Sequence, residues 1–256
     1  MMRVATPYWL VPVGSITFGV LLPTALLVPV AIEGWGSPMP WGAVWQVEVL
    51  TLRLGVYASA VTLVAAFLLA VATRQWSARA IAGVIVLIGA SAAVQTTFRA
   101  VYLQRLLGLG ENILGQSLAF GEAAVVSGLV FYLLPFAVSP LIVAVRRIDP
   151  ESEHVAELAG SSGLGLIWHV YLRPLTPAIG ALWVLCFTLA VGAYITPTIL
   201  GSINDITASR YLGALLSEGR AQEAATVALL TAMAPLALLG ILLCVGATTR
   251  SVRTRD

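Results

Sequence analysis

The sequence predicts an all-α integral membrane protein with six transmembrane helices and a short cytoplasmic helix between spans 4 and 5. Of its 256 residues, 59% are hydrophobic and only 10% are charged, and the mean hydropathy is +0.94. An ordinary soluble domain carries about 25% charged residues. The charged residues are also clustered, which leaves six long segments without Asp, Glu, Lys or Arg. Too little polar chain remains to cover such segments in water, so a bilayer is the expected solvent.

Each of these segments is long enough for a membrane span, which needs about 20 residues. They are Tyr8–Ile32, Leu54–Thr73, Ala80–Phe98, Ala123–Val145, a stretch with its core at Ala178–Leu200, and Ala224–Thr249. The first contains three prolines and lacks a small-residue cleavage site, so we interpret it as a retained span rather than a signal peptide. We expect a first helix and outer loop over residues 1–49, the main membrane domain over 50–249 and a cytoplasmic tail over 250–256.

The distribution of arginine predicts the orientation of the spans. If the N-terminus is inside, the inner segments are residues 1–7, 74–79, 146–173 and 250–256, and they hold nine of the 14 basic residues. The outer loops hold the other five. Basic residues collect in short cytoplasmic loops, so both termini are expected in the cytoplasm.

Several classes of chemistry have no residues to support them. All 14 basic residues are Arg, so a P-loop lysine and a Schiff-base lysine are both excluded. His154 and His169 form no paired-ligand motif, and we expect no metal site. No carboxylate lies deep inside a predicted span, which disfavours an ion-coupled carrier. The net charge of +2 does not suggest a nucleic-acid partner. We therefore expect no catalytic residue in this chain.

The loop between spans 4 and 5 has the signals of a helix at both ends. Asp149 is a good N-cap, and Pro150 suits the first helical position. Gly160 can adopt the left-handed conformation that ends a helix. The sequence thus predicts a helix over Pro150–Ala159 with one face of small residues, suited to a partner's groove. The alternative is an ordinary solvated loop.

This loop also resembles the signature of a known family. The stretches Ile148–Gly160 and Val170–Pro177 are similar to the E-A-A…G…L-P signature of binding-protein-dependent ABC importer permeases. When the two are aligned through Gly160, Ala156 also matches, but His154 stands at the usual Glu and Arg173 interrupts the L-P pair. Other stretches resemble the spermidine/putrescine-type branch, in order along residues 8–249. They are Leu50–Leu54, Phe98–Tyr102 with Gly110–Asn112, Tyr132–Phe136 and Gly192–Gly201.

The resemblance implies a type I permease domain over residues 50–249 in a bacterial inner membrane. Its partners would be a second, non-identical permease subunit, an ABC ATPase dimer and an extracytoplasmic solute-binding protein. The ATPase would bind ATP and Mg, so this chain would need no cofactor. The expected solute is a polyamine such as spermidine or putrescine, with iron, thiamine and sulfate left open. A secondary carrier or channel without an ATPase is the alternative class.

Three groups of residues are candidates for these roles. Contact with the ATPase is assigned to the predicted helix Pro150–Ala159 and its end, at Glu153, His154, Ala156 and Gly160. The translocation pathway is assigned to Tyr194, Thr196 and Pro197, where we expect proline to kink the fifth span; a kink needed only for packing is the alternative. The outer mouth, where a binding protein would touch, is assigned to Arg99, Glu111 and Asn112, although Arg99 could instead be an ordinary interfacial arginine.

Overall fold

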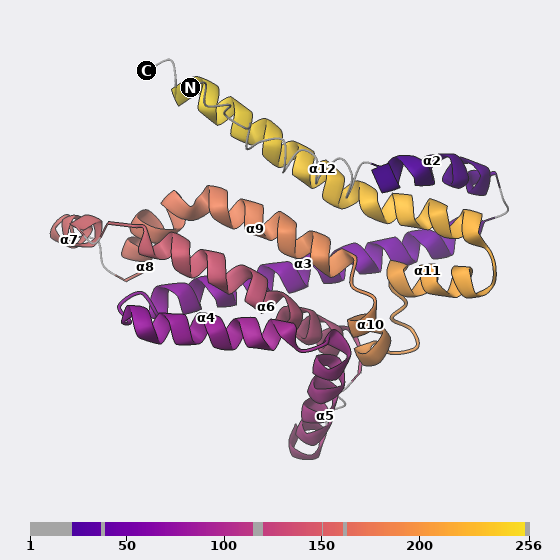
Figure 1. The fold of residues 1–256 in the computed structure, drawn as a ribbon, viewed down its shortest axis with the longest axis horizontal. Helices are drawn as coiled ribbons and strands as arrows, with labels where there is room; N and C mark the ends of the chain where they lie inside the picture. Colours follow the sequence, from indigo (N-terminus) through magenta and orange to yellow (C-terminus); the bar gives the residue numbers. More distant parts are fainter. Residues whose placement is uncertain (1–21, 37–38, 115–119, 150, 161–162, 254–256) are drawn as a thin grey trace, which may run out of the picture.

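The computed structural model describes residues 22–36, 39–114, 120–149, 151–160 and 163–253, and the regular structure in these ranges is helical (Figure 1). This confirms the predicted all-α class. The elements are α2 (Leu22–Trp35), α3 (Trp41–Ala72), α4 (Ala78–Ala93), α5 (Thr96–Leu114), α6 (Glu122–Arg146), α7 (Glu151–Leu158), α8 (Leu164–Leu166), the π-helix η2 (Ile167–Leu172), α9 (Arg173–Val191), α10 (Ile195–Leu200), α11 (Ala208–Ser217) and α12 (Ala221–Arg253).

Four helical segments are long and apolar enough to cross a membrane. They are Trp41–Ala72, Glu122–Arg146, Ile167–Val191 and Ala221–Ile241. A fifth candidate is the pair formed by α4 and the first part of α5, which is bent by 99°. Most of the predicted first span lies outside the described residues, and its described end forms α2, which has 14 residues. The described chain therefore offers four to five candidate spans, and six are not established.

Helix α6 lies at the centre of the bundle, packed against α3, α4, α5, α9 and α10. Its side chains Leu129, Leu133 and Leu141 are fully buried. Helices α3 and α9 also pack closely, because α3 presents Gly55 to α9. A Cβ at Gly55 would lie 3.0 Å from a methyl of Val191. Small residues at such crossings let membrane helices approach and gain packing contacts.

The outer surface of the bundle is apolar. Val64, Leu68, Val86 and Leu87 are all more than half exposed. In water such a surface would promote association, whereas lipid tails cover it in a bilayer. The exposed surface thus agrees with the apolar spans in indicating a multi-pass membrane protein.

Two helices extend beyond the charge-free segments that predicted them. Helix α3 begins at Trp41 rather than Leu54, because it carries two charged residues that are paired. The buried carboxylate of Glu48 accepts a hydrogen bond of 2.6 Å from Thr231 of α12, and Arg53 pairs with Glu122. The candidate span Trp41–Ala72 therefore contains a carboxylate near its start, whereas the predicted span Leu54–Thr73 contains none. Helix α12 likewise runs through Arg253, into the predicted tail.

Gly128 sets the distance between α6 and α10. A Cβ at this position would lie 2.6 Å from the methyl of Thr196 and closer still to a methyl of Leu200, and both side chains are buried. We expect Gly128→Ala to displace α10 and to lower stability by about 1–3 kcal/mol. The thermal unfolding midpoint of the purified protein in detergent measures this.

The matched control is Gly83→Ala in α4, where nothing lies within 4 Å of the new Cβ. This variant should unfold at or slightly above the wild-type midpoint, because alanine favours a helix over glycine. Equal midpoints for both variants would show that α10 does not depend on its close approach to α6.

Candidate functional site

Two interrupted helices meet beside α6. The first interruption is the sharp bend between α4 and α5 at Val94 and Gln95, and the second separates the end of α9 at Val191 from the start of α10 at Ile195 (Figure 1). Helices α5 and α10 pack together, and the side-chain amide of Gln104 donates a 3.5 Å hydrogen bond to the carbonyl of Ile199. Irregular backbone at membrane depth is tolerated only where it is buried in protein or lines a cavity.

Side chains satisfy the backbone groups that the interruptions leave free. The carbonyl of Ala193, just after α9, accepts a 2.8 Å hydrogen bond from the Ser209 hydroxyl. At the end of α4, the carbonyl of Ala92 accepts one of 3.3 Å from Arg99. Thr51 of α3 accepts a 2.7 Å hydrogen bond from the Ala208 amide at the start of α11. The Ser209 bond joins the α9–α10 interruption to α11, whereas Arg99 lies on α5 itself and the Thr51 bond is at the start of α11, beyond both interruptions.

A cavity of about 290 Å³ lies between the two interruptions. Thr96 from the first turn of α5 and Tyr132 from α6 line it, together with Thr188 of α9 and residues 192–196. Five of the residues that line it carry a hydroxyl group, namely Thr96, Tyr132, Thr188, Tyr194 and Thr196. The cavity can therefore hold a small polar solute or water.

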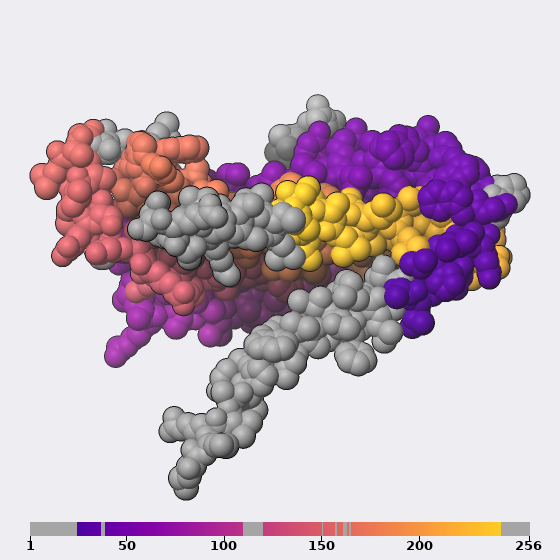
Figure 2. All heavy atoms as spheres, turned by 90° about the horizontal axis from the view of Figure 1, so that it is seen from above, coloured from indigo at the N-terminus to yellow at the C-terminus, as the bar shows by residue number. Residues whose placement is uncertain are grey.

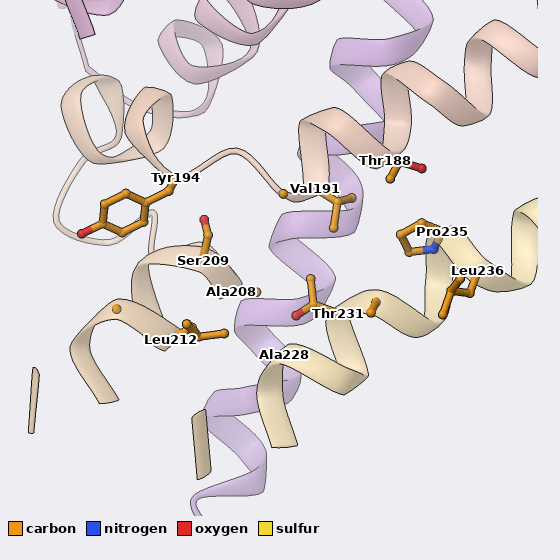
Figure 3. A pocket seen from close by; sticks show the side chains of 13 residues that line it. Thr188, Val191, Tyr194, Ala208, Ser209, Leu212, Ala228, Thr231, Pro235 and Leu236 are labelled. Carbon is orange, nitrogen blue, oxygen red and sulfur yellow. The ribbon is translucent and has the colours of Figure 1, made fainter. Parts of the chain in front are cut away.

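A larger cavity of about 530 Å³ lies on the other side of the α9–α10 interruption, between α9, α11 and α12 (Figure 3). Thr188, Gly192 and Tyr194 line both cavities. In Figure 3 the side chain of Tyr194 lies at one edge of this space, and Pro235 and Leu236 lie at the opposite edge. The interruption thus separates two hollows, and Tyr194, which is half exposed, borders each of them.

The three residues assigned to the pathway have different surroundings. Tyr194 lines both cavities, and the buried Thr196 lines the smaller one. Pro197 is buried and lines neither of the two. The expectation that Pro197 kinks the span is wrong, because the helix is already interrupted before it. Pro197 is the third residue of α10, where a backbone amide has no helical partner to lose.

Of the residues assigned to the outer mouth, Arg99 is the one whose side chain the structure describes. The side chain of Arg99 is only 8% exposed and lies over the Tyr132 ring, so it offers no contact surface for a binding protein. Glu111 and Asn112 lie in the last turns of α5, and their side chains are outside the described residues. No sequence signal assigns Tyr132, Thr188 or Ser209 to a site, because helical periodicity does not show which helices they face.

At one end of the bundle, α7 forms as the local sequence predicts. The Asp149 carboxylate accepts a 3.0 Å hydrogen bond from the Glu151 amide, as an N-terminal cap does. Gly160 has φ of +82°, the left-handed conformation expected of it. Pro150 lies outside the described residues, and the described helix runs from Glu151 to Leu158.

Arg74 holds α7 against the bundle. Its guanidinium forms an ion pair with Glu153, donates hydrogen bonds to the Tyr171 hydroxyl and, at 3.1 Å, to the Ile148 carbonyl, and lies over the Tyr171 ring. The pKa of Arg74 is lowered, because the effect of burial is larger than the opposing effect of the nearby Asp149 carboxylate. Glu153 therefore has an ion-pair partner within its own chain, and its assignment to the ATPase contact stays a prediction.

Helix α7 exposes two large apolar side chains, and one of them, Val155, also borders the groove between α7 and η2. Leu158 is 89% exposed and Val155 is 65% exposed, and His154 is also exposed. Ala156 is half-buried and lines a groove between α7 and η2, together with other members of the predicted small-residue face. Figure 2 shows the α7 segment at one end of the molecule and α2 at the other. Among the described residues, no group of three or more His, Cys, Asp or Glu could hold a metal ion.

Comparisons with solved structures identify the fold. The chain superposes on a chain of a bacterial ABC transporter involved in the import of the acidic polysaccharide alginate, with a TM-score of 0.64, 16% identity and coverage of 95% of this chain and 94% of that one. A second structure is the bacterial alginate ABC transporter in complex with an alginate pentasaccharide-bound periplasmic protein. It gives a TM-score of 0.67 with 15% identity, over 91% of each chain. The chain has the fold of an ABC importer permease.

Comparisons of sequence agree over part of the chain. The probable sulfate transport system permease protein cysT of Chlorokybus atmophyticus is 35% identical over 98 residues, which are 37% of this chain and 34% of that protein. The molybdenum transport system permease protein ModB of Mycobacterium bovis is 32% identical over 139 residues, 53% of each. The matched region thus spans about half the length of these relatives or less. No protein-family model matches the sequence.

We expect Arg74→Gln to loosen α7 without unfolding the bundle. The change removes the ion pair and two hydrogen bonds that join α7, η2 and the end of α3, and charge-assisted bonds of this kind contribute about 1.5–3 kcal/mol each. Hydrogen exchange of the backbone amides of residues 151–158 should accelerate roughly tenfold or more. The control is Arg79→Gln, which removes an exposed arginine at the same end. Equal exchange in both variants would contradict the role assigned to Arg74.

Proposed function

We propose that this chain is the transmembrane permease subunit of an ABC importer that moves a small solute delivered by an extracytoplasmic binding protein. ATP and Mg are bound by a separate ATPase dimer, and a second, non-identical permease completes the pore in the bacterial inner membrane. The observation that carries the proposal is α7, a capped helix fixed to the end of the bundle with two large apolar side chains exposed. The fold and the partial similarity to sulfate and molybdenum permeases support it.

The surface offered to the ATPase centres on His154, Val155 and Leu158, three exposed residues of α7 that follow Glu153, the partner of Arg74. Gly160 ends the helix and allows the chain to turn back toward η2. Glu153 and Ala156 act from behind by fixing the helix on the bundle. A helix held in this way transmits a push from the ATPase to η2 and α9.

The comparisons lend no support to a polyamine as the solute. The relatives are named for sulfate and for molybdenum, and the structural neighbours for alginate. Sulfate was one of the open alternatives, and a compact inorganic solute agrees with a pathway cavity of about 290 Å³. A carrier without an ATPase is the second candidate, because the buried carboxylate of Glu48 is a type of group that ion-coupled carriers use.

The ATPase contact is tested by Leu158→Arg. A charge on this apolar surface should reduce the amount of ATPase activity that co-purifies with the tagged chain from its native membrane by about tenfold, since central apolar contacts contribute about 1–2 kcal/mol to an interface. The matched control is Ile203→Arg, because Ile203 is equally exposed, at 89%, in the loop between α10 and α11. If no ATPase co-purifies with the wild-type chain, the carrier is favoured.

Orientation is tested by cysteine labelling in intact cells. Because basic residues mark the α7 end as cytoplasmic, a cysteine at position 203 should react with a membrane-impermeant maleimide, and one at position 158 should react only after the cells are opened. Both positions are highly exposed, so accessibility within the protein is matched. Labelling of position 158 in intact cells would place the α7 end outside and would contradict the proposed ATPase contact.

A further inference from the structure

Arg99 is a buried cation with unused hydrogen-bonding capacity. Its side chain is 8% exposed, and its Nη2 donates to the Ala92 carbonyl at 3.3 Å. Nε and Nη1 are buried and have no hydrogen-bond partner in the structure. Among the described residues, no carboxylate forms an ion pair with Arg99. An unmatched guanidinium costs several kcal/mol in a bilayer, because neither water nor a counter-charge stabilises it.

The surroundings of Arg99 favour a negative charge. Arg99 lies one turn inside the 19-residue helix α5, whose N-terminus carries a partial positive charge at the α4–α5 bend. Its guanidinium carbon lies 5.6 Å from the centre of the Tyr132 ring, so that ring supports one side of the cation without neutralising it. Two positive elements therefore meet at this bend. A cationic solute would be repelled by both of them.

There is space for a ligand on each side of this cluster. Arg99 itself lines a hollow of about 390 Å³, together with Ser91, Phe98 and Phe131. Tyr132 also lines the cavity between the two helix interruptions, to which the first turn of α5 contributes Thr96. The cluster of Arg99, Tyr132 and the α5 N-terminus thus adjoins both the hollow and the pathway cavity.

We propose that Arg99 and the N-terminus of α5 form an anion-binding site within the permease, where the solute is held as an anion during its passage. The identification of the bound anion as the transported solute rests on the proposed function. The binding site itself rests on the buried guanidinium with two unpaired donors, beside a helix N-terminus and two cavities. Because Nε and Nη1 are themselves buried, the guanidinium must turn toward the hollow for an anion there to accept from them and to supply the charge that Arg99 lacks.

The test uses the purified full chain in detergent and sulfate as the probe. Its thermal unfolding midpoint should rise with sulfate concentration beyond the effect of chloride at equal ionic strength, because a ligand that binds only the folded state stabilises it. Arg99→Gln should weaken the apparent affinity for sulfate by about tenfold or more, since it removes a charge-assisted hydrogen bond. The matched control is Arg105→Gln, which removes an exposed arginine from the same helix and should change the affinity less than about twofold.

A conservative variant covers the case in which Arg99→Gln does not fold. Arg99→Lys keeps the charge, so it should retain part of the sulfate effect while losing the geometry of the guanidinium. The absence of a sulfate-specific shift in the wild-type chain would overturn the inference, and so would equal affinities in Arg99→Gln and wild type. Putrescine should give no stabilisation, and a putrescine shift that requires Arg99 would also overturn it.

The proposed function and the anion site fail in different measurements. If the proposed function is wrong, no ATPase activity will co-purify with the tagged wild-type chain from its native membrane. This result does not depend on whether sulfate stabilises the purified protein. Failure of the anion site would appear in the sulfate titration, while Arg99→Gln still co-purifies with ATPase activity at the wild-type level. In the positive case, Arg99→Gln also lowers sulfate uptake in cells without lowering that co-purification.

Discussion

A helix that crosses a bilayer can be interrupted only if other groups take over the backbone hydrogen bonds that it gives up. This constraint determines where the candidate site lies. Ser209 of α11 bonds to the free carbonyl beside the α9–α10 interruption, and Arg99 of α5 bonds to the carbonyl at the end of α4. The α9–α10 interruption is thus stabilised by a helix from elsewhere in the bundle. The two interruptions lie together beside α6, whose Gly128 allows α10 to come close, and the cavity between them is a consequence of that packing.

The end of the bundle that carries α7 depends on a similar arrangement with charged groups. Arg74 joins the end of α3 to α7 and to Tyr171 of η2. From Tyr171 the chain continues through η2 and α9 without interruption to Val191, at the border of the larger cavity. A displacement of α7 is thus applied to one end of a continuous helical rod whose other end carries the α9–α10 interruption. In the proposed importer, this rod is the mechanical connection between the ATPase contact and the pathway.

The parts of the fold that could be predicted from the sequence are those fixed by local signals. Helix α7 was predictable because Asp149 and Gly160 act on their own neighbours, and α6 because charged residues, Glu122 and Arg146, mark its ends. The start of α3 was missed because Glu48 finds its partner, Thr231, on α12, far along the chain. The α4–α5 bend was missed because Val94 and Gln95 are not residues that interrupt helices. Pro197 was misassigned because proline disrupts a helix interior and is tolerated in a first turn, and the sequence did not show where α10 begins.

Arg99 shows the same limit at the level of a single side chain. Arg99 and Arg105 lie on one helix and have the same chemistry, yet one is buried against Tyr132 and the other is exposed. The difference arises because α5 leaves α4 at a sharp angle and directs its first turn into the bundle. In that position the guanidinium binds the last turn of α4 through one nitrogen and keeps two nitrogens without partners. A residue needed only to stabilise the bend would gain from having all its donors paired, so the two unpaired donors agree with the proposed anion site.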